Sequence, residues 1–209
     1  MVHIYYHIYA IDGVESIVDE QINLIKTHFD FPYILNVGIS IANDNESISY
    51  LFEKFDNVRD VRAKGNEFVT LDILEKDVDK FGDSDYILYL HTKGASKQSN
   101  QNVISWRQLM NYFNIEKCKN IFKIFEKTSY NTYGVLLGTA GKWRLYSGNF
   151  WWAKASYLKT IQMDGVRRNR FNAEVDYIQN GTDWKPYSPY NKEGENHYLI
   201  EFKREEYTL

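Results

Sequence analysis

The sequence predicts an α/β protein in which helices flank a central, mainly parallel sheet in three layers. Strand-like and helix-like segments alternate from the first residues up to Leu90. The run Tyr86–Leu90 is apolar without a break, which is typical of a strand covered on both faces. Such alternation favours parallel strands, because each helix returns the chain to the starting edge of the sheet.

Each element has its own signal in the sequence. The segments rich in β-branched and aromatic residues are the predicted strands His3–Ile11, Ile34–Ile41, Asn57–Arg62, Tyr86–Leu90 and Tyr133–Leu137. Apolar residues at helical spacing predict helices along Val18, Ile22, Ile25 and Phe29, along Phe68, Leu71, Leu74 and Val78, along Val103 to Phe113, and along Ile115 to Phe125. Shorter helices are predicted at Ser47–Phe55, up to Ile161, and at Asn172–Asn180 with Asn172 and Gly181 as caps.

Length and composition restrict the function classes. The 209 residues suit a single domain spanning 1–209. A formal net charge of −3 lacks the basic surplus of a nucleic-acid-binding protein. The single cysteine, Cys118, fits a reducing compartment. No apolar run reaches the roughly 20 residues of a membrane span, and the start does not resemble a signal peptide, so we expect a cytoplasmic protein.

Aromatic residues make up 16% of the chain, which suits either sugar and base binding or an aromatic core. Ligands of parallel sheets bind beyond the carboxyl ends of the strands. There, Lys93 could neutralise phosphate and Thr92 could donate a hydrogen bond. The turn Arg62–Glu67 brings cations to a helix start, which favours an anion or a nucleotide. Either segment could instead be a solvated polar turn.

Two segments of the second half could also carry chemistry. In Ser147–Trp152, small residues would let a ligand approach the backbone, and one tryptophan could stack on a sugar; both could instead belong to the core. Glu174 begins a predicted helix and could act as a general base, with Asp176 as second choice. The alternative is that these carboxylates only complement the helix dipole.

A metal site has weak support in the sequence. The pairs Asp77/Asp79 and Asp83/Asp85 precede the strand Tyr86–Leu90, so they are expected about 17 Å from its carboxyl end. His197 lies in the polar tail and could fold back as a metal ligand, although an isolated histidine usually is not one.

The element order and two strings resemble nucleotide-sugar glycosyltransferases of the GT-A fold. Tyr89-Leu90-His91-Thr92-Lys93-Gly94 and Tyr146-Ser147-Gly148-Asn149-Phe150-Trp151-Trp152 look like a subgroup of polysaccharide and capsid-glycan transferases from bacteria and large DNA viruses. That subgroup includes amino-terminal glycosyltransferase domains that build chlorella-virus capsid glycans. The resemblance implies transfer of a hexose from a nucleoside diphosphate sugar, most likely a UDP-sugar, to a hydroxyl of a glycan or glycoprotein.

The resemblance also implies roles for residues and a division of labour. Residues 1–100 would bind the nucleotide sugar, and residues 101–209 the acceptor. The nucleotide and donor sugar would meet Tyr9, Ala10, Ile11, Arg62, Asn66, His91, Thr92, Lys93, Ser147, Gly148 and Asn149. The acceptor would meet Trp151, Trp152 and Trp106, and the catalytic groups would be Glu174, Asp176 and Lys93. For a viral protein, the expected location is the host cytoplasm.

One departure from the family pattern concerns the metal. The family's Asp-X-Asp motif is replaced by His91-Thr92-Lys93, so dependence on Mn²⁺ or Mg²⁺ is expected to be weak or absent. Lys93, with Arg62 or Lys64, could stabilise the leaving diphosphate. The departure leaves open a non-catalytic carbohydrate-binding domain on the same fold. A nucleotidyltransferase is disfavoured, since Asp12-Gly13-Val14-Glu15 is not the Gly-rich, Lys-containing loop expected after the first strand.

Overall fold

The computed structural model describes residues 1–42, 47–140, 143–192 and 194–208. Within them, seven strands form one sheet in the order β3-β2-β1-β4-β8-β5-β9, and β6 and β7 form a separate hairpin. The strands are β1 (Val2–Ala10), β2 (Tyr33–Ile41), β3 (Val58–Ala63), β4 (Tyr86–His91), β5 (Thr132–Gly134), β6 (Leu137–Ala140), β7 (Trp143–Tyr146), β8 (Trp151–Lys154) and β9 (Pro186–Tyr187). The helices are α1 (Val14–His28), α2 (Ser47–Lys54), α3 (Phe68–Asp77), α4 (Gln101–Asn111), α5 (Cys118–Lys127), α6 (Ala155–Leu158) and α7 (Arg170–Val175).

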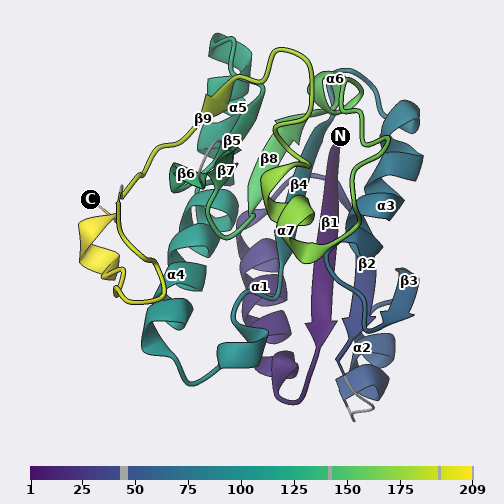
Figure 1. The fold of residues 1–209 in the computed structure, drawn as a ribbon, viewed down its shortest axis with the longest axis vertical. Helices are drawn as coiled ribbons and strands as arrows, with labels where there is room; N and C mark the ends of the chain where they lie inside the picture. Colours follow the sequence, from purple (N-terminus) through teal and green to yellow (C-terminus); the bar gives the residue numbers. More distant parts are fainter. Residues whose placement is uncertain (43–46, 141–142, 193, 209) are drawn as a thin grey trace.

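Strands β1 to β4 are mutually parallel, as the alternating sequence pattern predicts. Their carboxyl ends meet at one edge, toward which the arrow of β1 points at the bottom of Figure 1. The register places His7 of β1 directly beside His91 of β4. The sheet is thus mixed and mostly parallel, in a Rossmann-like arrangement.

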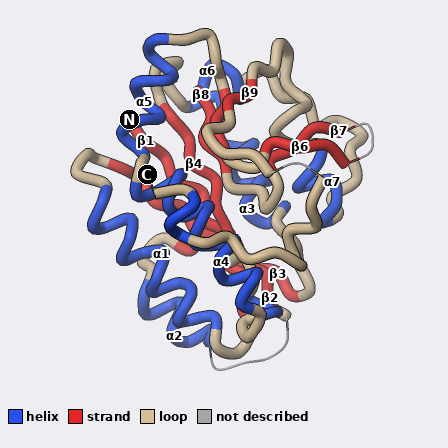
Figure 2. The backbone as a smooth tube through the Cα atoms, turned by 90° about the vertical axis from the view of Figure 1, so that its left-hand side faces the viewer, coloured by secondary structure: helices blue, strands red, loops and turns tan. Residues whose placement is uncertain are grey.

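Helices cover both faces of the sheet, as Figure 2 shows with strands in red between helices in blue. Alternate residues of β1 face opposite ways: Ile4 packs in the core cluster with α1, α4 and α5, whereas Tyr5 packs in the cluster with α3, α6 and α7. This alternation follows the two-residue period of a strand. Both faces are therefore apolar, as the unbroken run of β4 predicted.

Strand β8 corrects the prediction for the second half. The sequence predicts no strand at Trp151–Lys154, yet β8 lies antiparallel between β4 and β5. Trp152 and Trp151 then point to opposite faces of the sheet, and both are fully buried. The sheet therefore draws strands from both halves of the chain.

Several boundaries also differ from the prediction. Helix α7 begins at Arg170, because the side chain of Asn169 rather than Asn172 caps it by accepting from the Asn172 backbone N–H at 3.0 Å. The helix predicted up to Ile161 is the single turn α6. Within the described residues, none of the helices combines the length and apolar character that a bilayer crossing requires.

Candidate functional site

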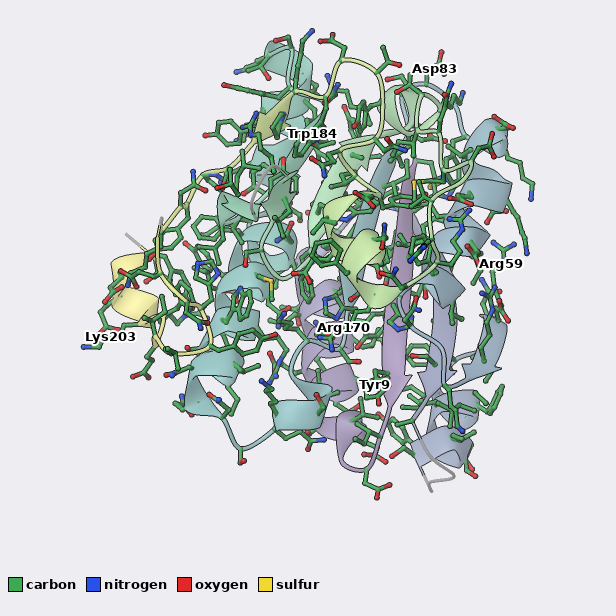
Figure 3. All side chains as sticks on the ribbon, viewed as in Figure 1. Tyr9, Arg59, Asp83, Arg170, Trp184 and Lys203 are labelled. Atoms are coloured by element: carbon green, nitrogen blue, oxygen red, sulfur yellow. The ribbon has the colours of Figure 1, made fainter. Side chains whose placement is uncertain are left out.

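A cavity of about 330 Å³ opens at the carboxyl ends of the parallel strands. We call it the strand-end cavity; its lining comprises His7, Tyr9, Ser40, Lys64, Gly65, Asn66, Glu67, His91, Thr92, Ser96 and Arg170. Figure 3 labels Tyr9 and Arg170 toward this end of the sheet and Asp83 at the opposite end. Of the predicted nucleotide contacts, Tyr9, Asn66, His91 and Thr92 line this cavity.

The loop after β4 is tied to the end of β1. The Thr92 hydroxyl oxygen accepts from the Tyr9 backbone N–H at 2.9 Å, and the Thr92 backbone N–H donates to the His7 carbonyl at 3.0 Å. Gly94 follows with a φ of 86°, in the left-handed region that favours glycine. These bonds hold the strand ends in a fixed relation, so the cavity has a rigid floor.

Two cations that line the strand-end cavity take part in no ion pair among the described residues. Neither Lys64 nor Arg170 forms an ion pair with any residue that the structure describes. The predicted cation Arg62 is not available in this way, because its guanidinium pairs with Asp60 and, at 2.7 Å, with Asp72. Arg62, predicted to contact the nucleotide, is thus not among the described residues lining this cavity, and the two described cations that line it are Lys64 and Arg170.

Ala10 and Ile11 also differ from their predicted role. The Ala10 side chain is fully buried in the core at the end of β1. Ile11 starts the turn into α1, where its carbonyl accepts from the Val14 backbone N–H at 3.0 Å. Neither is among the described residues that line the strand-end cavity, so only Tyr9 of this string reaches it.

Glu67 is a buried carboxylate that the sequence analysis did not single out. It lines the strand-end cavity and accepts hydrogen bonds from the Tyr89 hydroxyl at 3.1 Å and from the Asn149 side-chain amide. Asn149 in turn accepts from the Trp151 indole N–H at 2.9 Å. Asn149 is thus a buried connector between Glu67 and the core, which corrects its predicted contact with the donor sugar.

Gly148 lies behind the lining of the strand-end cavity, where it is bonded to His91 and to Glu174, and we call this residue the wall. The His91 Nε2 atom lies 2.8 Å from the Gly148 carbonyl oxygen, and the Gly148 backbone N–H donates to Glu174 at 3.3 Å. Burial, with a smaller contribution from the Lys93 charge, lowers the pKa of His91 to about 3. His91 is therefore neutral near pH 7, and its proton lies on Nε2, because a carbonyl oxygen can only accept.

The two predicted carboxylates have different surroundings. Glu174 is half-buried on α7, and its carboxylate is bound to the wall at Gly148. Asp176 follows the helix and accepts a hydrogen bond from the side-chain amide of Asn172. Glu174 is therefore the carboxylate connected to the candidate site, whereas Asp176 serves the local structure around α7.

The structure has a second cavity, of about 710 Å³, whose lining includes Ser147, the residue before Gly148. We call it the tail cavity; its lining comprises Trp106, Leu136, Leu137, Gly138, Thr139, Arg144, Leu145, Ser147, Lys192, Gly194, Glu195, Asn196, His197 and Tyr198. Ser147 and His197 meet here, with 2.8 Å between the hydroxyl oxygen and Nδ1. The chain after β9 thus supplies six of the fourteen described lining residues of a cavity that the sequence analysis did not predict.

Lys93 lies against two aromatic rings of the tail cavity and is itself not among the described residues that line either cavity. Its ammonium nitrogen lies 3.9 Å from the centre of the Trp106 ring and 5.6 Å from that of Tyr198. Both rings line the tail cavity. The predicted acceptor residues thus separate: Trp106 reaches a cavity, whereas Trp151 and Trp152 are core residues and cannot contact an acceptor.

The residues present do not form a metal centre. Among the described residues, no three or more His, Cys, Asp or Glu side chains come together in a way that could hold an ion. His197 is engaged with Ser147, and its Nε2 lies 3.4 Å from the Lys192 carbonyl oxygen. Asp85 pairs with the terminal amine of Met1 at 2.8 Å, at the amino edge of the sheet, as its position before β4 predicted.

Sequence reasoning missed His7, Ser40, Glu67 and Arg170. His7 and Ser40 face each other from β1 and β2, with 3.1 Å between Nε2 and the hydroxyl oxygen. Polar residues near the ends of otherwise apolar strands were the signal that could have found them. Arg170 could not be found in this way, because it begins α7, which is brought to the sheet only by tertiary packing.

The fold and these two cavities define a Rossmann-like α/β domain with a candidate binding site at the carboxyl edge of its parallel strands. The chain belongs to the family described as "Domain of unknown function (DUF8361)", whose model matches residues 3–202. No curated protein sequence matches the chain. A solved structure described as "Crystal structure of 4-diphosphocytidyl-2C-methyl-D-erythritol synthase" has a TM-score of 0.39 and 10% sequence identity, over 99% of this chain and 96% of that chain. A likeness of this strength shows no function.

Proposed function

We propose that the protein is a glycosyltransferase that moves a hexose from a nucleoside diphosphate sugar, with UDP-sugar the first choice, to a hydroxyl of a glycan. The observation that carries the proposal is that Gly148 connects the linings of two cavities, because His91 of the strand-end cavity binds its carbonyl and Ser147, which precedes it, lines the tail cavity. A transferase of this kind needs two subsites that adjoin at the reacting carbon, because proximity and orientation supply much of the rate.

The donor belongs in the strand-end cavity in this proposal. Lys64 and Arg170 are the cations that would face the diphosphate, and Tyr9 would lie against the base. Asn66 adds the start of α3, where its side-chain oxygen accepts from the Phe68 backbone N–H at 3.0 Å. Positive groups fixed before the reaction stabilise the charge that develops on a departing diphosphate.

The acceptor belongs in the tail cavity, and Glu174 is the proposed base. Trp106 and Tyr198 offer aromatic faces on which a sugar can stack. The hydrogen bond from Gly148 fixes the Glu174 carboxylate at the wall between the two subsites. A base at this junction would take the proton of the acceptor hydroxyl as that oxygen attacks the anomeric carbon of the donor.

A protein-held Mn²⁺ or Mg²⁺ does not fit the described side chains, since Glu67 is the single carboxylate among the described residues lining the strand-end cavity. These ions prefer sets of oxygen ligands. We therefore propose that transfer depends weakly or not at all on a divalent ion, with Lys64 and Arg170 supplying the positive charge.

Calorimetric titration with UDP tests the proposal, once with chelator and once with Mn²⁺, with GDP and CMP as controls. We expect micromolar affinity for UDP in chelator, and weaker affinity for the controls. Binding that requires Mn²⁺ would keep the transferase and overturn the metal proposal. Absence of binding under both conditions would favour a non-catalytic carbohydrate-binding domain instead.

A further inference from the structure

Lys93 is a buried cation that lacks an anionic partner. Its side chain is 5% exposed, and it forms no ion pair with any residue that the structure describes. Contact with the Trp106 and Tyr198 rings offsets only part of the free energy lost when an ammonium group is removed from water. A buried cation in this state favours the arrival of an anion from the adjoining cavity.

Trp106 provides an independent observation at the same place. Its indole N–H is buried and has no hydrogen-bond partner among the described residues, although the residue is only 3% exposed. A buried donor without an acceptor is destabilising, because it has lost its hydrogen bonds to water. The Trp106 ring lines the tail cavity, so the missing acceptor and the missing counter-charge of Lys93 can belong to one ligand.

The charged residues around the tail cavity also favour an anionic ligand. Arg144 and Lys192 line it against a single described carboxylate, that of Glu195. Arg144 forms no ion pair with the described residues, and Lys192 lies 3.8 Å from Glu195 and 3.9 Å from Glu206. Its volume of about 710 Å³ is large enough for a ligand beyond a small inorganic ion.

We propose that the tail cavity binds an anionic sugar, one that carries a carboxylate or a phosphate, and that the Lys93 ammonium and the Trp106 indole N–H contact its anionic group. The inference rests on the proposed function in assigning this sugar to the acceptor. It also gives Lys93 a role different from that of Lys64 and Arg170, which face the donor diphosphate.

Binding of defined sugars to the full chain tests this proposal. We would titrate methyl glucuronide, glucose 6-phosphate and neutral methyl glucoside, with tryptophan fluorescence and calorimetry as readouts. At least one of the two anionic sugars should bind ten-fold or more tightly than methyl glucoside, and the tighter of the two identifies the anion. Equal affinities for all three sugars, or no binding of any, would overturn the proposal.

Three variants test whether Lys93 and Trp106 contact the anionic group of the sugar. Lys93→Met and Trp106→Phe should each weaken the anionic sugar ten-fold or more and leave methyl glucoside unchanged. Lys97→Met is the matched control, because Lys97 lies 4.1 Å from the Tyr198 ring centre but is exposed, so its loss should change affinity less than three-fold. An equal loss in Lys97→Met would indicate a general positive potential and overturn the assignment.

These experiments distinguish a failure of the anionic-sugar inference from a failure of the proposed glycosyltransferase function. Anionic-sugar binding that depends on Lys93, in a protein that does not bind UDP, would support the inference and remove the glycosyltransferase. UDP binding without discrimination between charged and neutral sugars would support the glycosyltransferase proposal and overturn the inference about the anionic sugar. Circular dichroism of each variant identifies any that fails to fold, and Trp106→Phe, which breaks no described hydrogen bond, then tests the site alone.

Discussion

Gly148 shows how much depends on a single residue at this site. Its φ is 92°, and a Cβ atom there would lie 2.5 Å from the Met110 sulfur and 3.2 Å from Trp106 Cε2. Its two backbone groups are bonded to Glu174 and His91. Because a side chain here would both strain the backbone and collide with Met110, glycine is the residue that suits this position between His91 and Ser147.

Replacing Gly148 with alanine should therefore destabilise the protein by about 2–4 kcal/mol, from backbone strain and overpacking together. Gly165→Ala is the matched control, since Gly165 has a φ of 76° but nothing within 4 Å of the added carbon. It should lose only about 1–2 kcal/mol, from strain alone. Urea unfolding measures both values, and equal losses would contradict the packing argument.

Glu174→Gln tests the proposed base. The amide keeps the shape of the side chain but cannot take a proton, so sugar transfer should fall at least about 100-fold while UDP affinity stays unchanged. Asp176→Asn is the comparison, because Asp176 is bonded to Asn172 and should tolerate the change. Loss of UDP binding in a folded Glu174→Gln protein would exclude the role of Glu174 as base.

At the scale of elements, β8 connects the sheet to the helix that carries Glu174. Trp151 stacks on Tyr89 of β4 with 5.1 Å between ring centres, and on Tyr177, just after α7, at 6.0 Å. The indole is fully buried between them. Trp151 therefore packs the residue just after α7 against the sheet. This is a structural role in place of the predicted sugar contact.

Truncation of Trp151 to alanine should cost about 3–5 kcal/mol, because it leaves a large cavity between β4 and the segment after α7. Phe52→Ala, at a residue that is 52% exposed, should change stability by no more than about 0.5 kcal/mol. Urea unfolding of the two variants provides the comparison. Similar small effects in both variants would mean that the stacking of Trp151 contributes little to stability.

The elements also show where sequence reasoning succeeds and fails. Strands β1, β2 and β4 and helices α1 and α3 were predicted because each is long enough for a clear apolar period. The four-residue strands β6, β7 and β8 have no such period, and β8 exists because two neighbouring strands pair with it. The strand-end cavity followed from topology, whereas the pairing of Arg62 with Asp60 and Asp72 depends on side-chain geometry that no spacing reveals.

At the scale of the whole molecule, two buried histidines link stability to pH. His7 and His91 are adjacent across β1 and β4, and burial lowers the pKa of each to about 3. In the unfolded chain each has a pKa near 6.5, so between these values the unfolded state binds protons that the folded state does not. Acid therefore favours unfolding in this window.

The free energy of unfolding should accordingly fall between pH 7 and pH 5, by about 2 kcal/mol for each of the two histidines. Urea denaturation at several pH values measures the slope. The variant His7→Gln should be less stable at pH 7, because its contacts with Ser40 and Thr70 change, but its slope should be shallower. A stability that does not change from pH 7 to pH 5 would contradict burial of neutral histidines.

The two cavities draw on different stretches of the chain. All the described lining of the strand-end cavity except Arg170 comes from residues 7–96, whereas the tail cavity needs residues 192–198. Domains emerge from the ribosome with the amino-terminal part first. A growing chain therefore completes the floor of one cavity about a hundred residues before the other can close, and folding on the ribosome would form the two cavities in a fixed order.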